Sequence, residues 1–381
     1  MVPSGWERKA LDEVSDVIDC KHRTPKYVEN GIPLVSPGTI KWGAIDLESP
    51  TKRVTAEEYE SLMDHCTVEY GDLVLSRNQS VGIASFVDSD KPFVLGQDTV
   101  LVKPKGSDPR FLFYNLQSTD TQKTIFKLAG GSTFSRINLG DIRKLKAIYP
   151  PFAEQQKIAK ILSTWDKAIS TTECLIDNST QQKKALMQQL LTGKKRLLDE
   201  SGKRFEGKWE EGKLADFAKI KKGKALSSKD LKEGSYPVIA GGKSSPYNHS
   251  DFTHENIITV SASGAYAGYI AFFPYKIWAS DCSVVEPKSD NNIKYLYYWL
   301  TNQQQKIYTL QSGGAQPHIY PRDLDSMKIS IPNFKEQQKI ATVLTSADKE
   351  IELLEQQLAD LQQEKKALMQ VLLTGKKRVI V

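Results

Sequence analysis

The 381-residue sequence predicts an α+β fold of two duplicated halves, each a mixed α/β domain followed by a long coiled-coil helix. The first observation is a repeat: residues 150–196 reappear without a gap as residues 332–378, with 27 of 47 positions identical. The second is the regular spacing of apolar residues inside the repeat. The third is a fainter similarity between the segments that precede the two copies. Together they predict halves related by a pseudo-two-fold axis.

Each copy of the repeat carries the boundary signals of one long helix. Prolines come before it, and Glu154 and Glu336 place negative charge in the first turn. Gly193 and Gly375 end the helices beside a Lys-Lys-Arg cluster, which the helix dipole favours at this end. A helix of this length extends roughly 58 Å at 1.5 Å per residue.

Inside the repeat, apolar residues alternate at spacings of four and three over more than four heptads, which is typical of a coiled-coil seam. The seam of the first copy is weaker, because Thr172 and Ser179 stand where the second copy has leucines. Lys183 and Lys365 occupy matching seam positions. They either fix the register of pairing or extend their charged ends to solvent, and the sequence does not decide between these roles.

The repeats divide the chain into five segments. Residues 1–149 and 207–331 are the two globular domains, residues 150–196 and 332–378 are the helices, and residues 197–206 form a polar linker. The first domain carries predicted strands at residues 73–75, 83–87 and 99–102 and a predicted helix at residues 109–126.

The second domain retraces the first faintly. Residues 236–239, Tyr-Pro-Val-Ile, correspond to residues 32–35, Ile-Pro-Leu-Val. The helices have stayed nearly the same while the domains have diverged, which indicates a common task for the helices and different tasks for the domains. Antiparallel pairing of the helices is favoured, since parallel pairing would require the short linker to be fully extended along a helix.

Composition indicates a water-soluble globular protein, with 39% apolar and 26% charged residues. The four cysteines are scattered and suggest neither disulfides nor a zinc site. No run reaches the ~18 apolar residues of a membrane span. We expect a cytoplasmic protein with reduced thiols and no membrane partner. The net charge of +6 permits nucleic acid as a partner without requiring it.

Catalytic motifs are mostly missing from the sequence. Residues 241–244 end like a phosphate-binding loop, but Pro237 stands where its first glycine belongs. Asp281, Glu286 and Lys288 only faintly match a nuclease carboxylate set. The five histidines never reach metal-ligand spacing, and no Ser-His-Asp pattern is evident. We therefore expect no catalytic residues and no metal site.

Polar and basic residues in glycine-flanked loops are the candidates for reading base edges in the major groove of DNA. Ordinary solvated loops are the alternative for each residue taken singly. In the first domain the candidates are Lys21, His22, Arg23, Thr24, Ser36, Arg77, Asn78, Gln79, Ser132, Thr133 and Arg136. In the second they are Lys221, Lys222, Lys224, Lys243, Ser244, Ser245, Ser261, Ser263, Gln316, His318 and Arg322.

The chain as a whole resembles the specificity subunit of type I restriction-modification systems. The resemblance is carried by the duplicated half, by Pro-x-Phe-x-Glu-Gln-Gln-Lys-Ile-Ala at the start of each helix, and by Leu-Leu-Thr-Gly-Lys-Lys-Arg at its end. It implies that residues 1–149 and 207–331 are target recognition domains and that the helices are spacers. Two unlike domains on such helices fit an asymmetric, bipartite site on double-stranded DNA, with half-sites about one helical turn (~34 Å) apart.

The resemblance also implies partners. Two methyltransferase subunits, and in the full complex two restriction subunits, would bring S-adenosylmethionine, ATP and magnesium, while this chain binds no cofactor itself. The two near-identical helix starts could then dock two copies of one partner. The residues expected to contact that partner are Glu154, Gln155, Gln156, Lys157, Glu336, Gln337, Gln338 and Lys339.

Two other interpretations remain open from sequence. The chain could be a coiled-coil adaptor whose domains bind proteins, in which case gel-shift experiments with the methyltransferase subunits would show no preference for a DNA sequence. It could also be a self-sufficient nuclease, which would cleave DNA when incubated alone with magnesium.

Overall fold

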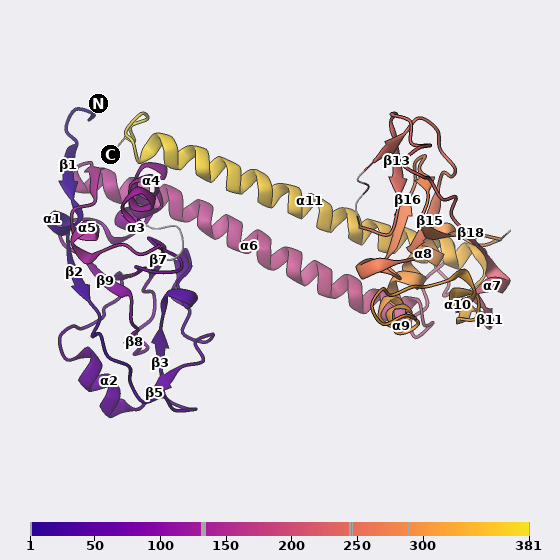
Figure 1. The fold of residues 1–381 in the computed structure, drawn as a ribbon, viewed down its shortest axis with the longest axis horizontal. Helices are drawn as coiled ribbons and strands as arrows, with labels where there is room; N and C mark the ends of the chain where they lie inside the picture. The colour runs from indigo at the N-terminus through magenta and orange to yellow at the C-terminus, as the bar shows by residue number, and fades with distance from the viewer. Residues whose placement is uncertain (1, 131–134, 244, 246, 289, 381) are drawn as a thin grey trace. The chain divides into compact units, whose positions relative to one another are not determined.

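The structure, a computed structural model, describes residues 2–130, 135–243, 245, 247–288 and 290–380. The chain forms two compact units (Figure 1). Unit 1 comprises Met1–Glu173 and Gln357–Val381, and unit 2 comprises Cys174–Gln356. Each unit therefore contains one globular domain and a portion of both long helices. Among the described residues, no helix is long and apolar enough to cross a membrane.

Unit 1 holds a five-stranded sheet in the order β2-β9-β6-β7-β4, a three-stranded sheet in the order β5-β3-β8, and the pair β1-β10. Its elements are β1 (Glu7–Ala10), α1 (Leu11–Val14), β2 (Ser15–Asp19), β3 (Ile32–Val35), η1 (Pro37–Thr39), β4 (Gly43–Ala44), β5 (Arg53–Val54), α2 (Ala56–Met63), β6 (Leu73–Ser76), β7 (Ala84–Phe86), β8 (Val94–Leu95), β9 (Thr99–Pro104), α3 (Pro109–Gln117), α4 (Thr119–Leu128), α5 (Leu139–Arg143) and β10 (Lys146–Tyr149).

Unit 2 holds a four-stranded sheet in the order β12-β18-β15-β16, a three-stranded sheet in the order β14-β13-β17, and the pair β11-β19. Its elements are β11 (Glu210–Lys213), α7 (Leu214–Phe217), β12 (Ala218–Lys222), β13 (Tyr236–Ile239), β14 (Asn248–His249), β15 (Ile257–Ser261), η2 (Gly264–Tyr266), β16 (Ile270–Phe273), β17 (Trp278–Ala279), β18 (Cys282–Pro287), α8 (Ile293–Asn302), α9 (Gln304–Thr309), α10 (Pro321–Asp325) and β19 (Lys328–Ile331).

The two units share one topology, which confirms the α+β class and the duplicated halves. β3 and β13, whose Ile-Pro-Leu-Val and Tyr-Pro-Val-Ile segments correspond in sequence, each pair with one antiparallel and one parallel strand. Among the described residues, unit 2 has no counterpart of β4 or α2. The difference lies between β3 and β6 in unit 1, where residues 36–72 correspond to the shorter stretch 240–256 of unit 2.

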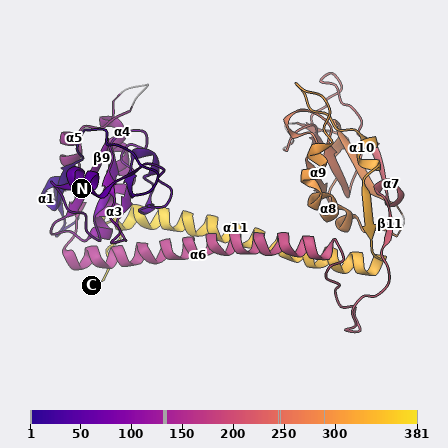
Figure 2. The same ribbon diagram turned by 90° about the horizontal axis from the view of Figure 1, so that it is seen from below.

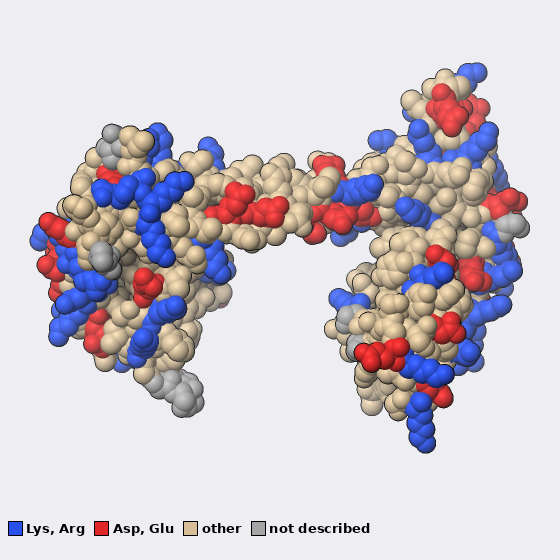
Figure 3. All heavy atoms as spheres, turned by 90° about the horizontal axis from the view of Figure 1, so that it is seen from above, with Lys and Arg blue, Asp and Glu red and all other residues tan. Residues whose placement is uncertain are grey.

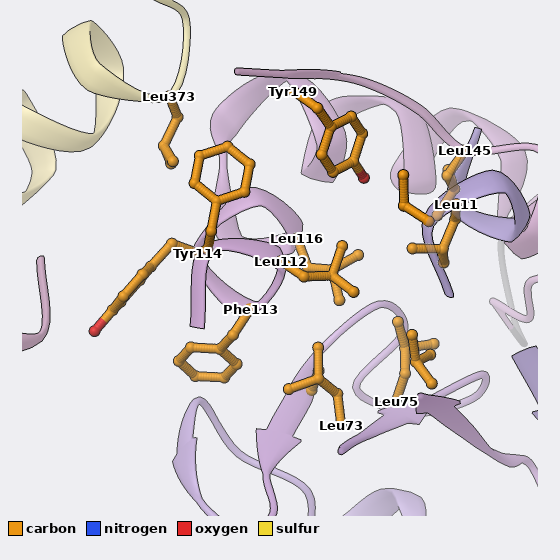
Figure 4. Packing of buried hydrophobic residues seen from close by; sticks show 14 of the residues in the cluster. Leu11, Leu73, Leu75, Leu112, Phe113, Tyr114, Leu116, Leu145, Tyr149 and Leu373 are labelled. Atoms are coloured by element: carbon orange, nitrogen blue, oxygen red, sulfur yellow. The ribbon is translucent and has the colours of Figure 1, made fainter. Parts of the chain in front are cut away.

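Alternating side chains along the central strands fill a core on each face of the large sheet. In unit 1, Leu73 and Leu75 of β6 lie in one apolar cluster, with α3, while Val74 lies in another, with α2. Figure 4 shows Leu73 and Leu75 close to Leu112 and Phe113 of α3. β6 is buried along its whole length, which explains why it reads as a continuous apolar run.

The predicted helix at residues 109–126 is two helices. α3 ends at Gln117, and Ser118 adopts an extended backbone (φ −59°, ψ 145°) before α4 begins. The Ser118 hydroxyl then accepts a hydrogen bond from the Thr121 amide at 3.3 Å, so this residue caps the second helix. Apolar periodicity continues through the break, and the sequence therefore concealed it.

The repeats form α6 (Phe152–Leu190) and α11 (Phe334–Leu372), each of 39 residues. Both end as predicted, on glycines in the left-handed region: Gly193 has φ +70° and Gly375 has φ +67°. Two residues beyond each glycine, a lysine amide donates back into the last turn, from Lys195 to the Gln189 carbonyl and from Lys377 to the Val371 carbonyl, both at 3.1 Å.

Within each unit the helices run antiparallel and side by side (Figure 1, Figure 2). In unit 1, Lys365 of α11 pairs with Asp166 of α6. In unit 2, Lys183 of α6 pairs with Asp348 of α11. Each aspartate also accepts a hydrogen bond from a tyrosine of its own domain, so the seam lysines do connect the helices in register. This favours the register role over extension to solvent.

A second pair of contacts joins the ends of the helices. Arg378, just after α11, donates to both carboxylate oxygens of Glu154 at 2.6 and 2.7 Å, and the Trp6 indole donates to the same carboxylate at 3.2 Å. In unit 2, Arg196 donates to both oxygens of Glu336 at 2.5 and 2.6 Å. Both carboxylates are buried. These contacts attach the start of one helix to the end of the other.

Replacing Glu154 by Gln should destabilise unit 1 in a pH-dependent way. Hydrogen bonds from Arg378 hold the pKa of the Glu154 carboxyl below its ordinary 4.5. A lowered folded-state pKa adds stability that is present above pH 4.5 and lost as the pH falls through the folded pKa. We expect E154Q to cost about 1–3 kcal/mol at pH 7, and this difference from the native chain should shrink progressively below pH 4.5.

Thermal denaturation of both chains across this pH range provides the measurement. The control is Glu173→Gln, which alters an exposed residue of α6. A penalty for E154Q that stays constant from pH 7 into the acid range would contradict the role given to Arg378.

Candidate nucleic-acid interface

In unit 1, the loops that carry the predicted base-reading residues meet at one end of the five-stranded sheet. β2 ends at Asp19, β6 ends at Ser76 and β9 begins at Thr99, and these three strands are neighbours. The loops that follow are joined by backbone hydrogen bonds, from the Arg77 amide to the Asp98 carbonyl at 2.8 Å and from the Ile137 amide to the Arg77 carbonyl at 3.0 Å. The structure therefore brings together predicted residues that are far apart in sequence.

Arg77 is buried at the centre of these loops, and this speaks against the prediction that it reads bases. One guanidinium nitrogen donates to both carboxylate oxygens of Asp19 at 2.8 and 2.9 Å, and another donates to the Ile137 carbonyl at 3.3 Å. Only 6% of Arg77 is exposed. Arg77 therefore joins its own loop to the loops at Asp19 and Ile137. A buried cation is stable only when it is paired and hydrogen-bonded, so these contacts occupy its guanidinium.

Three further candidates of unit 1 are also occupied by contacts inside the unit. Lys21 pairs with Asp64 at 2.6 Å, and Arg23 pairs with Glu58, which ties the loop after β2 to the region of α2. The Thr24 hydroxyl accepts a hydrogen bond from the side-chain amide of Gln97 at 3.3 Å. These side chains shape the loop surface, and a DNA contact would have to compete with the contacts they already make.

His22, Ser36, Asn78, Gln79 and Arg136 remain at the loop surface. His22 lies 3.1 Å from the Asp19 carboxylate, Ser36 precedes η1, and Asn78 bridges to Arg136 through the backbone. Arg136 contacts Asp98 at 2.7 Å with 47% of its side chain exposed. Gln79 is exposed and has φ +58°, an unfavourable backbone for a residue with a side chain, and such strain gathers at functional sites.

Among the candidates of unit 2, the basic residues other than Lys221 lie against aromatic rings. Both Lys222 and Arg322 lie over the Tyr320 ring, at 5.6 and 5.1 Å from its centre, and His318 stacks on it at 6.2 Å. Lys243 lies 5.4 Å from the ring centres of Tyr266 and Tyr269. Lys224 lies over Trp278 at 5.1 Å. A surface of cations and aromatic faces suits nucleic acid, where phosphates and base faces are both available.

Sequence reasoning missed the aromatic members of this surface, Tyr266, Tyr269 and Tyr320. The available signal was an aromatic residue close to each predicted polar residue, such as Tyr320 two positions after His318. The remaining polar candidates vary in exposure. Lys221 and Gln316 are exposed, the Ser245 hydroxyl donates to the Val238 and Tyr247 carbonyls, Ser263 donates to Asp281, and Ser261 is buried.

Three predicted residues, Ser132, Thr133 and Ser244, lie outside the residues that the structure describes.

Unit 1 also has a basic groove that sequence reasoning did not identify. It is a cavity of about 990 Å³ between α4, the β1-β10 pair and the C-terminal part of α11. Figure 3 shows Lys and Arg side chains gathered over this unit. Among the described residues lining the groove, Asp120 is the only acidic one. Six basic residues of the groove make no ion pair with a described residue: Arg8, Lys123, Lys127, Lys146, Lys366 and Lys376.

The expected partner contacts at the helix starts divide into two sets. Glu154 and Glu336 are buried in the ion pairs described above, and Gln155 and Gln337 are buried beside them. The side-chain oxygen Oε1 of Gln155 accepts from the Ser107 hydroxyl and from the backbone amide of Asp108, both at 2.9 Å. These four residues attach each domain to its helix, which corrects the prediction that they face a partner.

The other four, Gln156, Lys157, Gln338 and Lys339, are exposed and remain candidates for partner contact.

One group of described residues has ligand atoms close enough for a metal ion. Ligand-type atoms of Asp19, Cys20 and His22 lie within 4.8 Å of one another. Asp19 is already paired with Arg77, and burial raises the pKa of the Cys20 thiol, which disfavours the thiolate that a metal requires. We therefore assign no metal to this group.

Comparison with known proteins gives a consistent result. The family model of the type I restriction modification DNA specificity domain matches residues 3–178 and again residues 206–363. A Methanocaldococcus jannaschii protein described as a candidate type I restriction enzyme specificity subunit, MjaX, is 28% identical over 99% of this chain and 95% of its own. The MjaVIII specificity subunit of the same organism is 26% identical over 73% of this chain and 72% of its own.

Two solved structures share the fold. The S subunit of a type I restriction-modification system from M. genitalium superposes with a TM-score of 0.67 at 19% identity, covering 97% of this chain and 96% of that chain. A chain from a structure concerned with assembly and conformational transition of a type I system superposes with a TM-score of 0.58 at 15% identity, covering 99% of this chain and all of that one.

The different roles of Arg77 and Arg136 can be separated by alanine substitution. R77A removes a buried cation and leaves Asp19, whose side chain is 26% exposed, without its closest charged partner, so we expect unit 1 to lose about 1.5–3 kcal/mol of stability. R136A removes an exposed pair and should cost no more than about 1 kcal/mol. Thermal denaturation of the two variants is the measurement. If R136A were the more destabilising variant, this division of roles would be wrong.

Proposed function

Because this chain belongs to the type I restriction-modification DNA specificity family, we propose that it reads a bipartite DNA site with one unit on each half-site. Family membership makes it the subunit that recognises DNA within a complex with other subunits, and not the catalytic subunit. It also decides against the adaptor and nuclease interpretations. What carries the bipartite proposal is that two units of one topology present different side chains at the same end of the same sheet.

The two surfaces support different half-sites. In unit 1 the exposed candidates include Gln79 and Arg136, beside loops fixed by Arg77. In unit 2 the matching end offers lysines and an arginine against tyrosine rings. Arginine, glutamine and asparagine distinguish base pairs by paired hydrogen bonds in the major groove, whereas cation–aromatic surfaces favour phosphates and exposed base faces. Two such surfaces would read unlike sequences.

The basic groove of unit 1 supports contact with the DNA backbone. Six basic side chains that make no ion pair with a described residue line this cavity, and Asp120 is the only acidic residue among the described ones that line it. Such a cavity favours an anionic chain, and each phosphate neutralised releases counterions. Backbone contacts of this kind would set the position of the unit on DNA without reading its sequence.

The two helix starts support docking of two copies of one methyltransferase subunit. Gln156 and Lys157 on α6 are repeated as Gln338 and Lys339 on α11, and all four are exposed. Equivalent surfaces can bind equivalent partners. In the proposed complex those partners, and two restriction subunits, carry S-adenosylmethionine, ATP and magnesium, while this chain supplies recognition only.

Exchanging the first domain tests the assignment of half-sites. If residues 1–149 are replaced by the corresponding domain of another family member, only one half of the methylated site should change, because unit 2 keeps its own loops. Methylome sequencing of cells that express the hybrid with its methyltransferase partner would give both halves at once. A hybrid that alters both halves, or neither, would rule out one unit per half-site.

A matched deletion in the helices tests whether they set the gap between half-sites. Removing one heptad from each of α6 and α11, in register, preserves the seam and shortens each helix by about 10 Å. We expect the unspecified gap to shrink by about three base pairs, while both recognised sequences stay the same. Deleting a heptad from α6 alone is the control, since it breaks the register between α6 and α11 and should prevent the two helices from pairing. An unchanged gap would remove the spacer role.

A further inference from the structure

Unit 2 contains a small cavity on the face of its four-stranded sheet that packs against β13. Its volume is about 260 Å³. Thr259 and Ser261 of β15 line one side, Ala271 and Phe273 of β16 another, and Ile239 of β13 and the following turn complete the wall. The cavity is also lined by three residues that the sequence predicted as base-reading candidates: Lys243, Ser245 and Ser261.

The equivalent place in unit 1 is filled. There, β4 pairs with β7, and Ser85, which stands opposite Val74 as Ala271 stands opposite Thr259, is covered by the chain at Lys41: the Ser85 hydroxyl donates to the Lys41 carbonyl at 2.7 Å. Among the described residues of unit 2, no strand pairs with the outer edge of β16. Along the chain, the described residues that connect β13 to β15 form no helix. The shorter connection, residues 240–256, therefore leaves open in unit 2 a space that residues 36–72 close in unit 1.

A serine in the cavity wall has no partner for its hydroxyl. Ser261 is 4% exposed, and its Oγ makes no hydrogen bond with any described residue. Ser76 occupies the same strand position in unit 1, opposite Thr99 as Ser261 is opposite Cys282, and its hydroxyl donates to the Asn78 carbonyl at 2.6 Å. Leaving a buried hydroxyl unpaired is unfavourable, so Ser261 points to a ligand that would supply the missing partner.

The lining indicates the chemical class of that ligand. Tyr269, Phe273 and Tyr275 offer aromatic surfaces, whereas the hydroxyls of Thr259 and Ser261 offer hydrogen bonds on the sheet side. Lys243, over the Tyr266 and Tyr269 rings, adds a positive charge beside the cavity. The volume falls below the range of ~300–1,000 Å³ usual for drug-sized ligands. A flat ring with a polar edge and an attached anion matches these features.

We propose that this cavity receives one unpaired nucleobase from the DNA half-site bound by unit 2. The aromatic side chains pack on the base, the Ser261 hydroxyl bonds to its polar edge, and Lys243 contacts the adjoining phosphate. This rests on the proposed function and extends it: unit 2 reads one base by extruding it from the duplex, while unit 1, whose equivalent space is filled, does not. A free nucleotide has the same chemistry, and the experiment must separate the two sources.

The test uses the complex of this chain with its methyltransferase subunits and duplexes that carry the recognised site. At each position of the second half-site in turn, the base opposite is replaced by an abasic residue, and the dissociation constant is measured. Unpairing a base costs a few kcal/mol in an intact duplex, so removing its partner should tighten binding by roughly tenfold or more at the position whose base enters the cavity. Each methyltransferase subunit extrudes its own target base, so each half-site should show one such position at the methylated base. The cavity predicts one further position, in the second half-site and not in the first.

Variants then assign the effect to the cavity. Ala271→Ile fills it with a residue suited to a strand, and Lys243→Ala removes the charge beside it. Both should abolish most of the tightening at that one position. Lys276→Ala is the matched control, because Lys276 also lies over an aromatic ring, that of Phe252, but does not line the cavity. It should leave the tightening unchanged.

Ser261→Ala separates a binding role from a structural one. Removing an unpaired buried hydroxyl should leave the melting temperature unchanged or raise it, yet it should weaken discrimination among bases at the tightened position. The same change at Ser76, whose hydroxyl is bonded, should lower the melting temperature. A destabilised S261A with unaltered base discrimination would overturn the role given to this serine.

The outcomes distinguish the inference from the function on which it rests. If the complex binds its site specifically but no position other than the methylated bases is tightened, the inference fails and the proposed function stands. The inference also fails if the tightening at the further position persists in A271I and K243A. Titration of the complex with the four deoxynucleoside monophosphates covers the other source: saturable binding without a further tightened position would make this a free-nucleotide site. A complex without sequence preference would overturn both proposals.

Discussion

A buried carboxylate at the start of each long helix is the constraint on which the rest of the structure depends. Burying an ionised group is costly unless it is fully paired, and here the pairing comes from an arginine that follows the other helix. Glu154 with Arg378 and Glu336 with Arg196 therefore attach the helices to each other, and Trp6 extends the attachment to the first strand of unit 1. The identical residues that mark the repeat therefore stabilise each unit from within.

This constraint leaves the opposite end of each sheet free to vary. In both units the strands follow one topology and place their loops at the same end of the sheet. The charged residues of these loops, however, make different contacts in the two units. Unit 1 uses Arg77, Lys21 and Arg23 to fix its own loops. Unit 2 has a shorter connection after β13 and places its basic residues on aromatic rings. A shared scaffold with divergent loops is the arrangement that the proposed reading of two different half-sites would require.

The fold was largely predictable, because its signals are local and repeated. Helix ends at Gly193 and Gly375, the duplication and the α+β class all follow from spacing and from residues with strong backbone preferences. The break at Ser118 was not predictable, since apolar periodicity runs through it. For the candidate site, the sequence could predict which polar residues lie in loops, but it could not predict which of their side chains are exposed to a ligand. Arg77 and Gln79 stand two positions apart in one loop, and one is buried while the other is exposed.

The sequence by itself determined that the chain is duplicated, that each half ends in a long helix, and that polar residues gather in the loops of each domain, because repeats, periodicity and composition can be read along the chain. Only the tertiary structure decided which of those polar residues face outward. It showed that Glu154 and Gln155 are buried in contacts within the unit. It also showed that Ser261 borders an open cavity, whereas the hydroxyl of its counterpart in unit 1, Ser76, is hydrogen-bonded. The physical reason is that burial and pairing depend on neighbours brought together by folding, and no local pattern specifies them.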